Sequence, residues 1–322
     1  MPTFSCHLLW YNFNRHYRMQ EKNKKGIIQL FHNPTAGDEA HNQEKLTSLI
    51  ELAGYQCRYS STKKSSIKDF DEEASFIVIA GGDGTVRKIS KKMLDRKVLD
   101  HHWPVAVLPL GTANNIAKTL GLDRPVEEIV NAWEHCEKKK FDVGRIINID
   151  EAHFFLESFG YGLFPYLMKE MKKRNKESEP ATPEEALFTS LKVLHEILLS
   201  YKPRYCNLQI DGVDHSGKYL MVEIMNTKSI GPNLFLSPDA DPGDGKLEVV
   251  MIPEADKDLF AEYVKGKING QEVDFDFSGV HAREVKISWD GTHVHVDDEV
   301  LKLEKNHKVE IELKEGLLEF LV

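Results

Sequence analysis

The stretch IAGGDGTVRK, residues 79–88, places an aspartate between glycines directly after an apolar run. The run FIVIA (76–80) has the composition of a buried strand, and VRKISKKMLD (86–95) is a helix candidate. Glycines between a strand and a helix let backbone amides approach an anion closely, and the helix adds its positive end. The stretch predicts a phosphate site, although a tight turn with Asp83 as a capping residue would also explain it.

Two other strand ends share this pattern. GIIQLF (26–31) runs into HNPTAG (32–37), and WPVAVLPL (103–110) runs into GTANN (111–115). Ligands of open α/β sheets bind at the carboxyl ends of the strands, so the three loops together predict one nucleotide site. They contain neither GxGxxG nor GxxxxGK[ST], which gives no support to a dinucleotide fingerprint or a Walker loop. The binding residues expected from these two loops are Asn33, Gly111, Thr112 and Asn114.

Strands and helices alternate in the first part of the chain, which predicts a doubly wound domain with a mostly parallel sheet. Beyond it, segments such as KYLMVEIMNT (218–227) and KVEIELKEG (308–316) alternate with period two, as strands of an antiparallel sandwich or barrel do. One helix is expected there, with Thr182 as its N-cap and Glu185 closing a capping box. The predicted fold class is therefore α/β plus all-β: a doubly wound α/β nucleotide-binding domain with a second antiparallel β-sandwich domain.

The domain boundary is placed in the charged segment EHCEKKKF (134–141). The α/β domain is predicted to span 26–138 and the β-sandwich domain 139–322, with a return of the last strand to the first domain left open. Residues 1–25 have no clear period and lack the apolar core and cleavage site of a signal peptide. They are expected to be a disordered extension, unless residues 1–18 precede the true start of translation.

Composition excludes several classes of protein. The chain has 322 residues, of which 41% are hydrophobic and 29% charged, as in an ordinary globular protein. A net charge of -9 argues against a general nucleic-acid binder. No run approaches the ~20 apolar residues of a membrane-spanning helix. The four cysteines form no CxxC pair, so zinc and a disulfide framework are poorly supported and a reducing cytosol is favoured.

A series of short motifs runs through nearly the whole chain: NPTAG (33–37), GGDGT (81–85), PLGTANNIAKTLGL (109–122), FDVG (141–144), LSPDADPGDGKLEVV (236–250) and VDDE (296–299). In this order and spacing they resemble the diacylglycerol kinase catalytic family, which includes bacterial lipid kinases and eukaryotic sphingosine kinases. GGDGT also occurs in NAD kinases, whereas the PLGTxN and PxAxxxDGxL patterns favour the lipid-kinase side.

The resemblance implies ATP and Mg²⁺ as cofactors, a cleft between two domains as the active site, and a diacylglycerol-like or long-chain-base lipid as the acceptor. Glu299 falls where the family has its general base, and Asp83 would hold the triphosphate together with Mg²⁺. The ATP-site residues implied are Gly81, Gly82, Gly84, Thr85 and Thr112, with Ser60 at the end of the second strand. The structural metal loop of bacterial members corresponds to Asp241, Asp244 and the backbone carbonyl of Lys246, with Asp142 joined through water.

Several positions depart from the family pattern. Ala36 replaces a usual Ser, Arg87-Lys88 replace Asn-Glu, Asn115 replaces a frequent Asp, and Asp298 replaces the Gly of a DGE motif. Arg87 or Lys88 either compensates by neutralising phosphate charge or is a surface helix position. The departures keep two alternatives open: a kinase of a soluble metabolite, as the NAD kinases are, and a non-catalytic nucleotide or lipid sensor.

Two segments have competing explanations. His293, His295 and Asp297 share a predicted strand face with Glu299, which would also suit Fe²⁺ or Zn²⁺. LFPYLMKEMKKRNK (163–176) sets apolar residues before a basic cluster, as in a peripheral membrane contact, or is a core strand followed by a solvated loop. The expected partners are ATP and a lipid acceptor at a membrane surface, with no nucleic acid and with a homodimer left open. The expected location is the cytoplasm, or the inner membrane face as a peripheral protein.

Overall fold

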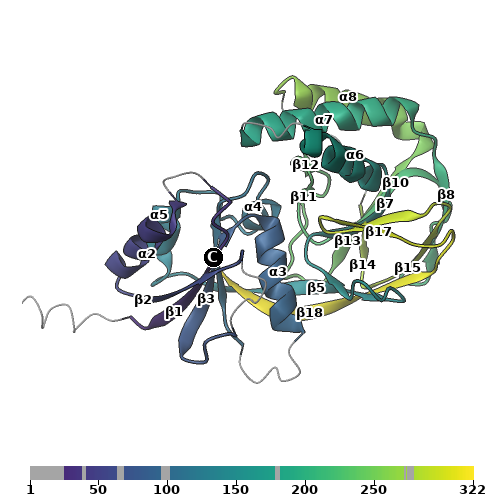
Figure 1. Ribbon diagram of the computed structural model, residues 1–322. Coiled ribbons are helices and arrows are strands. Elements are labelled where there is room, and N and C mark those ends of the chain that lie inside the picture. The colour runs from purple at the N-terminus through teal and green to yellow at the C-terminus, as the bar shows by residue number, and fades with distance from the viewer. Residues whose placement is uncertain are drawn as a thin grey trace, which may run out of the picture.

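The computed structural model describes residues 25–37, 41–63, 69–95, 102–177, 182–271, 273 and 279–322. Apart from Lys25, the predicted N-terminal extension lies outside these residues. The chain forms two lobes (Figure 1), an N-terminal lobe drawn in purple and blue and a C-terminal lobe drawn mainly in green and yellow.

A parallel sheet forms the centre of the N-terminal lobe. In spatial order its strands are β2 (Gln56–Ser61), β1 (Ile27–His32), β3 (Ala74–Gly81) and β4 (Val105–Pro109). The strands β1, β3 and β4 are runs of buried aliphatic residues, as expected for a sheet covered by helices. The helices of this lobe are α2 (Gln43–Leu52), α3 (Asp83–Leu94), α4 (Asn115–Thr119) and α5 (Val126–Ala132), and the predicted α/β class is confirmed.

Antiparallel pairing dominates the C-terminal lobe, and the inward-facing side chains of its strands make a second core. The predicted β-sandwich class is confirmed. The longer strands are β5 (Lys138–Ile147), β7 (Ser158–Gly162), β8 (Arg204–Ile210), β10 (Gly217–Met225), β13 (Leu247–Pro253), β15 (Glu284–Trp289) and β18 (Val309–Leu321). The shorter ones are β6 (Phe154–Phe155), β9 (Val213–Asp214), β11 (Ser229–Ile230), β12 (Leu234–Phe235), β14 (Gly279–Ala282), β16 (His293–Val296) and β17 (Glu299–Lys302).

Helices α6 (Leu163–Glu177), α7 (Pro183–Ser200) and α8 (Lys257–Ile268) lie over one side of this lobe (Figure 1), and a short 3₁₀ turn, η2 (Glu254–Asp256), precedes α8. The sequence predicted α7 alone, and that expectation of one helix is wrong. The predicted N-cap of α7 is confirmed, because the Thr182 hydroxyl accepts a hydrogen bond from the Glu185 backbone N–H at 3.1 Å. The helices share a third core, in which α8 contributes Phe260, Tyr263 and Val264 at helical spacing.

Helix α6 corrects the interpretation of the segment 163–176 as a membrane contact. Leu163, Phe164 and Leu167 are buried in the third core, so they are not available to insert into a bilayer. The alternative of a core strand followed by a loop is also wrong, because the segment is one continuous helix. Within the described residues, no helix combines the length and apolarity that a membrane span requires.

Strand β18 joins the two lobes. Along most of its length it pairs antiparallel with β5, and near its end it pairs parallel with β4 at Phe320 and Val105 (Figure 1). Leu318 and Phe320 lie in the core of the N-terminal lobe, whereas Val309 lies in the second core. The two lobes therefore share a two-stranded connection, and the predicted linker 134–141 contains the start of β5.

Candidate active site

Two glycine loops meet at the carboxyl edge of the parallel sheet. Gly82 is the N-cap of α3, so the residues that follow it form the first helical turn rather than a free loop. A Cβ atom on Gly111 would lie 2.3 Å from the Gly82 Cα, and one on Gly82 would lie 2.9 Å from the Gly111 Cα. The two backbones touch with no room for side chains, which explains both glycines. A Cβ atom on Gly81 would likewise lie 2.5 Å from the Thr85 hydroxyl.

Asp83 links these loops through hydrogen bonds. Its carboxylate accepts from the backbone N–H groups of Asn115 at 2.9 Å and Ile116 at 3.0 Å, so it caps helix α4 from a distance. Burial raises the pKa of Asp83, although these two amides act in the opposite direction. The Asn114 side chain accepts from Gly111 N–H at 2.9 Å and donates to the Gly111 carbonyl at 2.9 Å. Both side chains thus fix the loop geometry, and the role of Asp83 toward Mg²⁺ stays a prediction.

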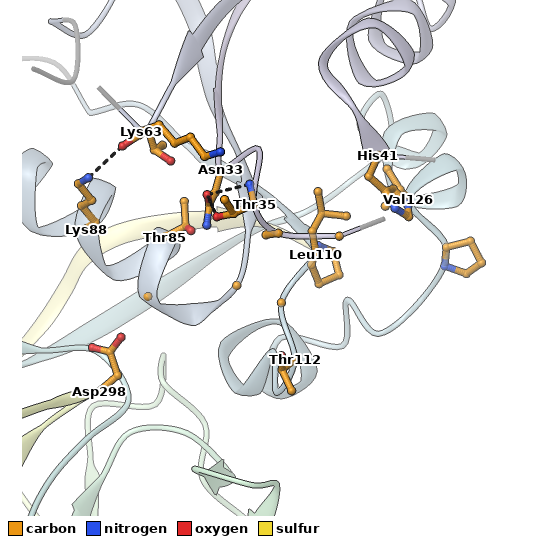
Figure 2. Close-up of a pocket in the computed structure, with 18 of the residues that line it drawn as sticks. Asn33, Thr35, His41, Lys63, Thr85, Lys88, Leu110, Thr112, Val126 and Asp298 are labelled. Atoms are coloured by element: carbon orange, nitrogen blue, oxygen red, sulfur yellow. Dashed lines mark hydrogen bonds between the residues drawn. The ribbon is translucent and has the colours of Figure 1, made fainter. Parts of the chain in front are cut away.

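A cavity of about 1070 Å³ opens in front of these loops (Figure 2). Of the predicted ATP-site residues, it is lined by Asn33, Gly82, Gly84, Thr85, Gly111 and Thr112. Ser60, Gly81 and Asn114 do not line this cavity, and the Ser60 hydroxyl instead accepts a hydrogen bond from Gln29 at 3.4 Å. We call this space the first cavity.

Three cationic side chains line the first cavity, and none of them was among the predicted ATP-site residues. Lys63, Lys88 and Arg124 line it, and the Lys88 ammonium donates to the Thr62 carbonyl at 3.1 Å (Figure 2). Lys88 is an exposed residue of α3 that also lines the first cavity, so both alternatives, charge neutralisation and a surface position, stay open for it. Lys63 lies two residues beyond the end of the edge strand β2, so the carboxyl end of that strand was the signal that could have found it.

Arg87 points to the other lobe. Its guanidinium forms an ion pair with Asp298 and lies 4.0 Å from Asp297 and 3.7 Å from Glu299. Its side chain is only 15% exposed, so the surface alternative is wrong for Arg87. The VDDE motif and the GGDGTVRK stretch thus meet across the cleft through this one arginine.

The three acidic residues of the VDDE motif differ in position. Asp297 is buried, and its carboxylate accepts from the backbone N–H groups of Leu156, Glu157 and Ser158 at 2.8–3.2 Å. Asp298 lines the cleft (Figure 2). Glu299, the predicted general base, has a side chain that is 60% exposed and lies outside the lining of both cavities described here. Its catalytic role stays a prediction.

A second cavity, of about 350 Å³, adjoins the first and shares Gly82, Gly84, Thr112 and Asp298 with it. One wall is apolar and consists of Phe164, Met168 and Ile230. The lining is also acidic: besides Asp83, Asp297 and Asp298, it includes Glu157, which sequence analysis did not select. An acid inside the apolar run FFLESFGYG (154–162) was the signal that could have found it.

His295 also lines the second cavity but is fully engaged. Its Nε2 lies 2.6 Å from the Glu223 carboxylate, and its Nδ1 lies 2.9 Å from the Asp297 carbonyl. Burial alone would lower the pKa of His295, but the Glu223 carboxylate and the Asp297 carbonyl raise it overall. His293 instead contacts the Lys169 ammonium at 3.0 Å. Among the described residues no His, Cys, Asp and Glu cluster suits a metal, so nothing supports the Fe²⁺ or Zn²⁺ alternative.

The predicted metal loop is held by other contacts. The Asp142 carboxylate accepts from the backbone N–H groups of Gly245 at 2.8 Å and Gly316 at 2.7 Å. Asp241 pairs with the Lys139 ammonium at 2.8 Å, and Asp244 accepts from the Lys246 N–H at 3.0 Å. Because a lysine cation already neutralises Asp241, the side chains in this arrangement do not fit a bound Mg²⁺.

We therefore expect EDTA to leave the thermal unfolding midpoint of the protein unchanged in the absence of nucleotide. The Lys139→Ala variant is the matched comparison, because it removes the cation from Asp241 and should be stabilised by added Mg²⁺. The measurement is thermal unfolding by circular dichroism, with and without EDTA or Mg²⁺. A lower midpoint of the wild type in EDTA would show that this loop does hold a metal.

Comparison with known proteins places this geometry in a family. Residues 28–146 match the diacylglycerol kinase catalytic domain, and residues 173–315 match the YegS C-terminal NAD kinase β-sandwich-like domain. The chain therefore contains a diacylglycerol kinase catalytic domain, followed by a YegS-like C-terminal domain. A diacylglycerol kinase of Bacillus subtilis is 24% identical to this protein over 260 residues, which cover 76% of this chain and 80% of that protein.

Solved structures share the fold. A diacylglycerol kinase from Bacillus anthracis has a TM-score of 0.68 at 19% identity, covering 92% of this chain and 96% of that one. An NAD kinase from Archaeoglobus fulgidus, solved in complex with ATP, has a TM-score of 0.51 at 14% identity, covering 92% and 93%. At these identities the likeness establishes the fold alone, and the family match establishes that the chain is a kinase-family protein.

Proposed function

We propose that this protein is an ATP-dependent lipid kinase, which transfers the γ-phosphate of ATP to a hydroxyl group of a diacylglycerol-like or long-chain-base lipid. The observation that carries the proposal is the pair of adjoining cavities. One is polar and cationic, the other has an apolar wall, and they meet at Gly82, Gly84 and Thr112. A phosphoryl donor and an apolar acceptor can therefore meet at one place.

The first cavity suits a triphosphate. The glycine contacts bring backbone close to the cavity, helix α3 directs its amino end toward it, and Lys63, Lys88 and Arg124 supply positive charge. Mg²⁺ would arrive with ATP and would neutralise phosphate charge. Asp83, beside the phosphate loops, is the predicted carboxylate ligand, through the lone pairs that its two backbone hydrogen bonds leave.

The second cavity has an apolar part that suits a lipid acceptor. Phe164, Met168 and Ile230 would contact the carbon chain next to the reacting hydroxyl. Polar side chains of the same cavity, such as Asn115 and Ser158, would also suit the polar groups of a soluble dinucleotide, the acceptor of the metabolite-kinase alternative, and the acceptor panel separates the two.

Phosphate transfer from radiolabelled ATP to a panel of acceptors tests the proposal. The panel contains 1,2-dioleoylglycerol and sphingosine in mixed micelles, and NAD in solution, with Asp83→Ala and Glu299→Ala compared with the wild type. We expect label in a lipid and none in NAD. Label in NAD alone would replace the lipid kinase by a metabolite kinase, and ATP binding without transfer to any acceptor would favour a sensor.

The Lys88→Ala variant is expected to bind ATP about 5- to 30-fold more weakly, because it loses a charge-assisted contact worth about 1–2 kcal/mol. Lys91→Ala is the matched control, since Lys91 lies on the same helix but does not line the first cavity. Isothermal titration calorimetry with ATP and Mg²⁺ measures both affinities. Equal affinities of the two variants would show that the triphosphate lies elsewhere.

A further inference from the structure

Glu157 is a buried carboxylate of the second cavity that none of the other assignments uses. It lies between β6 and β7, next to the phosphate loops, and its residue is 7% exposed. Within the described chain, the only hydrogen bond that its carboxylate accepts comes from the Asn115 side-chain amide, at 3.3 Å to Oε2. Oε1 is therefore left available on the side chain.

The other carboxylates of this cavity are already committed. Both oxygens of Asp83 accept backbone N–H groups of α4, and Asp297 is surrounded by the amides of residues 156–158. Asp298 forms its ion pair with Arg87. A carboxylate that already accepts several hydrogen bonds is a weaker base, because those bonds stabilise its charged form. Glu157 has the least such stabilisation of the four.

Neighbouring groups fix the orientation of Glu157. The Ser229 hydroxyl donates to Asn115 Oδ1 at 2.7 Å, so the amide NH₂ of Asn115 must face the other way, toward Glu157. The Asn115 backbone N–H in turn donates to Asp83 at 2.9 Å. One asparagine thus connects the glutamate to the phosphate loops on one side and to the C-terminal lobe on the other.

We propose that Glu157 is the proton acceptor for the lipid hydroxyl, an inference that rests on the kinase function proposed above. The hydroxyl O–H bond breaks and its proton goes to Oε1 of Glu157. The oxygen forms the new bond to the γ-phosphorus, and the bond from that phosphorus to the β–γ bridging oxygen breaks, so ADP leaves. Apolar residues of the same cavity, Phe164 and Met168, hold the acceptor chain while this occurs.

The direction of the pKa shift of Glu157 agrees with its proposed role as the proton acceptor. Burial, followed by the nearby carboxylates of Asp83 and Asp297, raises the pKa of Glu157 well above its usual range, although the Asn115 hydrogen bond and the positive charge of Arg87 act in the opposite direction. A carboxylate with a raised pKa takes a proton more readily. Because the base works only when ionised, activity should fall as the pH is lowered through this raised pKa. The acid limb of the pH profile should thus lie at higher pH than an exposed glutamate would give.

The test compares Glu157→Gln with the wild type, using ATP and whichever of 1,2-dioleoylglycerol and sphingosine the wild type phosphorylates. We expect kcat to fall by about 10²–10⁴-fold. The affinity for ATP should be unchanged, and the acid limb of the pH profile should disappear. Glu304→Gln, an exposed position outside both cavities, is the matched control and should behave as the wild type.

A second variant guards against a merely structural effect. Glu157→Ala should be partly rescued by added formate, which can enter the space left by the side chain and accept the proton. Full activity of Glu157→Gln, a retained acid limb, or a large loss in Glu299→Gln together with none in Glu157→Gln would overturn the assignment. A wild type that binds ATP but phosphorylates neither lipid would overturn the lipid kinase function itself, which separates the two failures.

Discussion

Gly111→Ala is expected to abolish measurable ATP binding while leaving the protein folded. The new methyl group would lie 2.3 Å from the Gly82 Cα and 2.7 Å from the Asn114 side-chain oxygen, so the two phosphate loops must separate. Overpacking of this kind costs about 1–3 kcal/mol of stability. The amides that face the first cavity would shift with the backbone, and we expect ATP affinity to fall by at least about 100-fold, or ~2.7 kcal/mol.

Calorimetric titration with ATP and a thermal melt measure the two effects. Gly212→Ala is the control, because Gly212 has a φ of +83° and no heavy atom within 4 Å of an added Cβ, so it reports backbone strain alone. It should lose stability but bind ATP normally. If Gly111→Ala bound ATP as the wild type does, the contact between the two glycine loops would not shape the nucleotide site.

Glu223→Ala is expected to destabilise the protein by about 3–5 kcal/mol, because it removes one partner of a buried pair. The side chains of Glu223 and His295 are 0% and 1% exposed, and their contact is 2.6 Å long. The variant would leave the His295 Nε2 buried without a partner beside an empty space. Chemical denaturation in urea at neutral pH measures the loss.

Glu223→Gln separates charge from hydrogen bonding. The glutamine amide can donate to Nε2 of a neutral His295 while Nδ1 donates to the Asp297 carbonyl. We expect it to cost less than about 1.5 kcal/mol, the usual net value of one hydrogen bond. If Glu223→Ala were no worse than Glu223→Gln, the pair would not contribute to stability in the way its burial indicates.

The phosphate loops were predictable because their signals are local. A run of strand-forming residues followed by glycines can be recognised from adjacent residues alone. Six of the predicted ATP-site residues line the first cavity. Gly81 and Asn114 belong to the same glycine loops, but they support the loops instead of lining the cavity. Ser60 was implied by the family resemblance alone, and its hydroxyl accepts a hydrogen bond from Gln29 within the sheet. The direction of a side chain depends on its neighbours in space, and the motif alone does not contain that information.

Contacts between distant segments were not predictable. In the sequence, Arg87 departed from the family pattern without an explanation. The structure explains it, because Arg87 pairs with the acidic residues Asp298 and Glu299 of the other lobe. Helices α6 and α8 were missed because their apolar residues face a core that also contains residues of β10 and β13. Tertiary burial of this kind overrides weak local patterns.

The sequence by itself determined the two-part fold, the family and the three loops that end at one sheet edge, because periodicity and glycine position act over a few residues. Only the tertiary structure decided which hydrogen bonds and ion pairs each carboxylate of the cleft receives, and our proposal for Glu157 rests on that difference. Asp83 and Asp297 accept several backbone N–H groups and Asp298 pairs with Arg87, whereas the Glu157 carboxylate accepts one amide hydrogen bond, from Asn115, among the described residues. The reason is physical: the basicity of a carboxylate depends on its burial and on the hydrogen bonds it receives, and both are set by segments far apart in the chain.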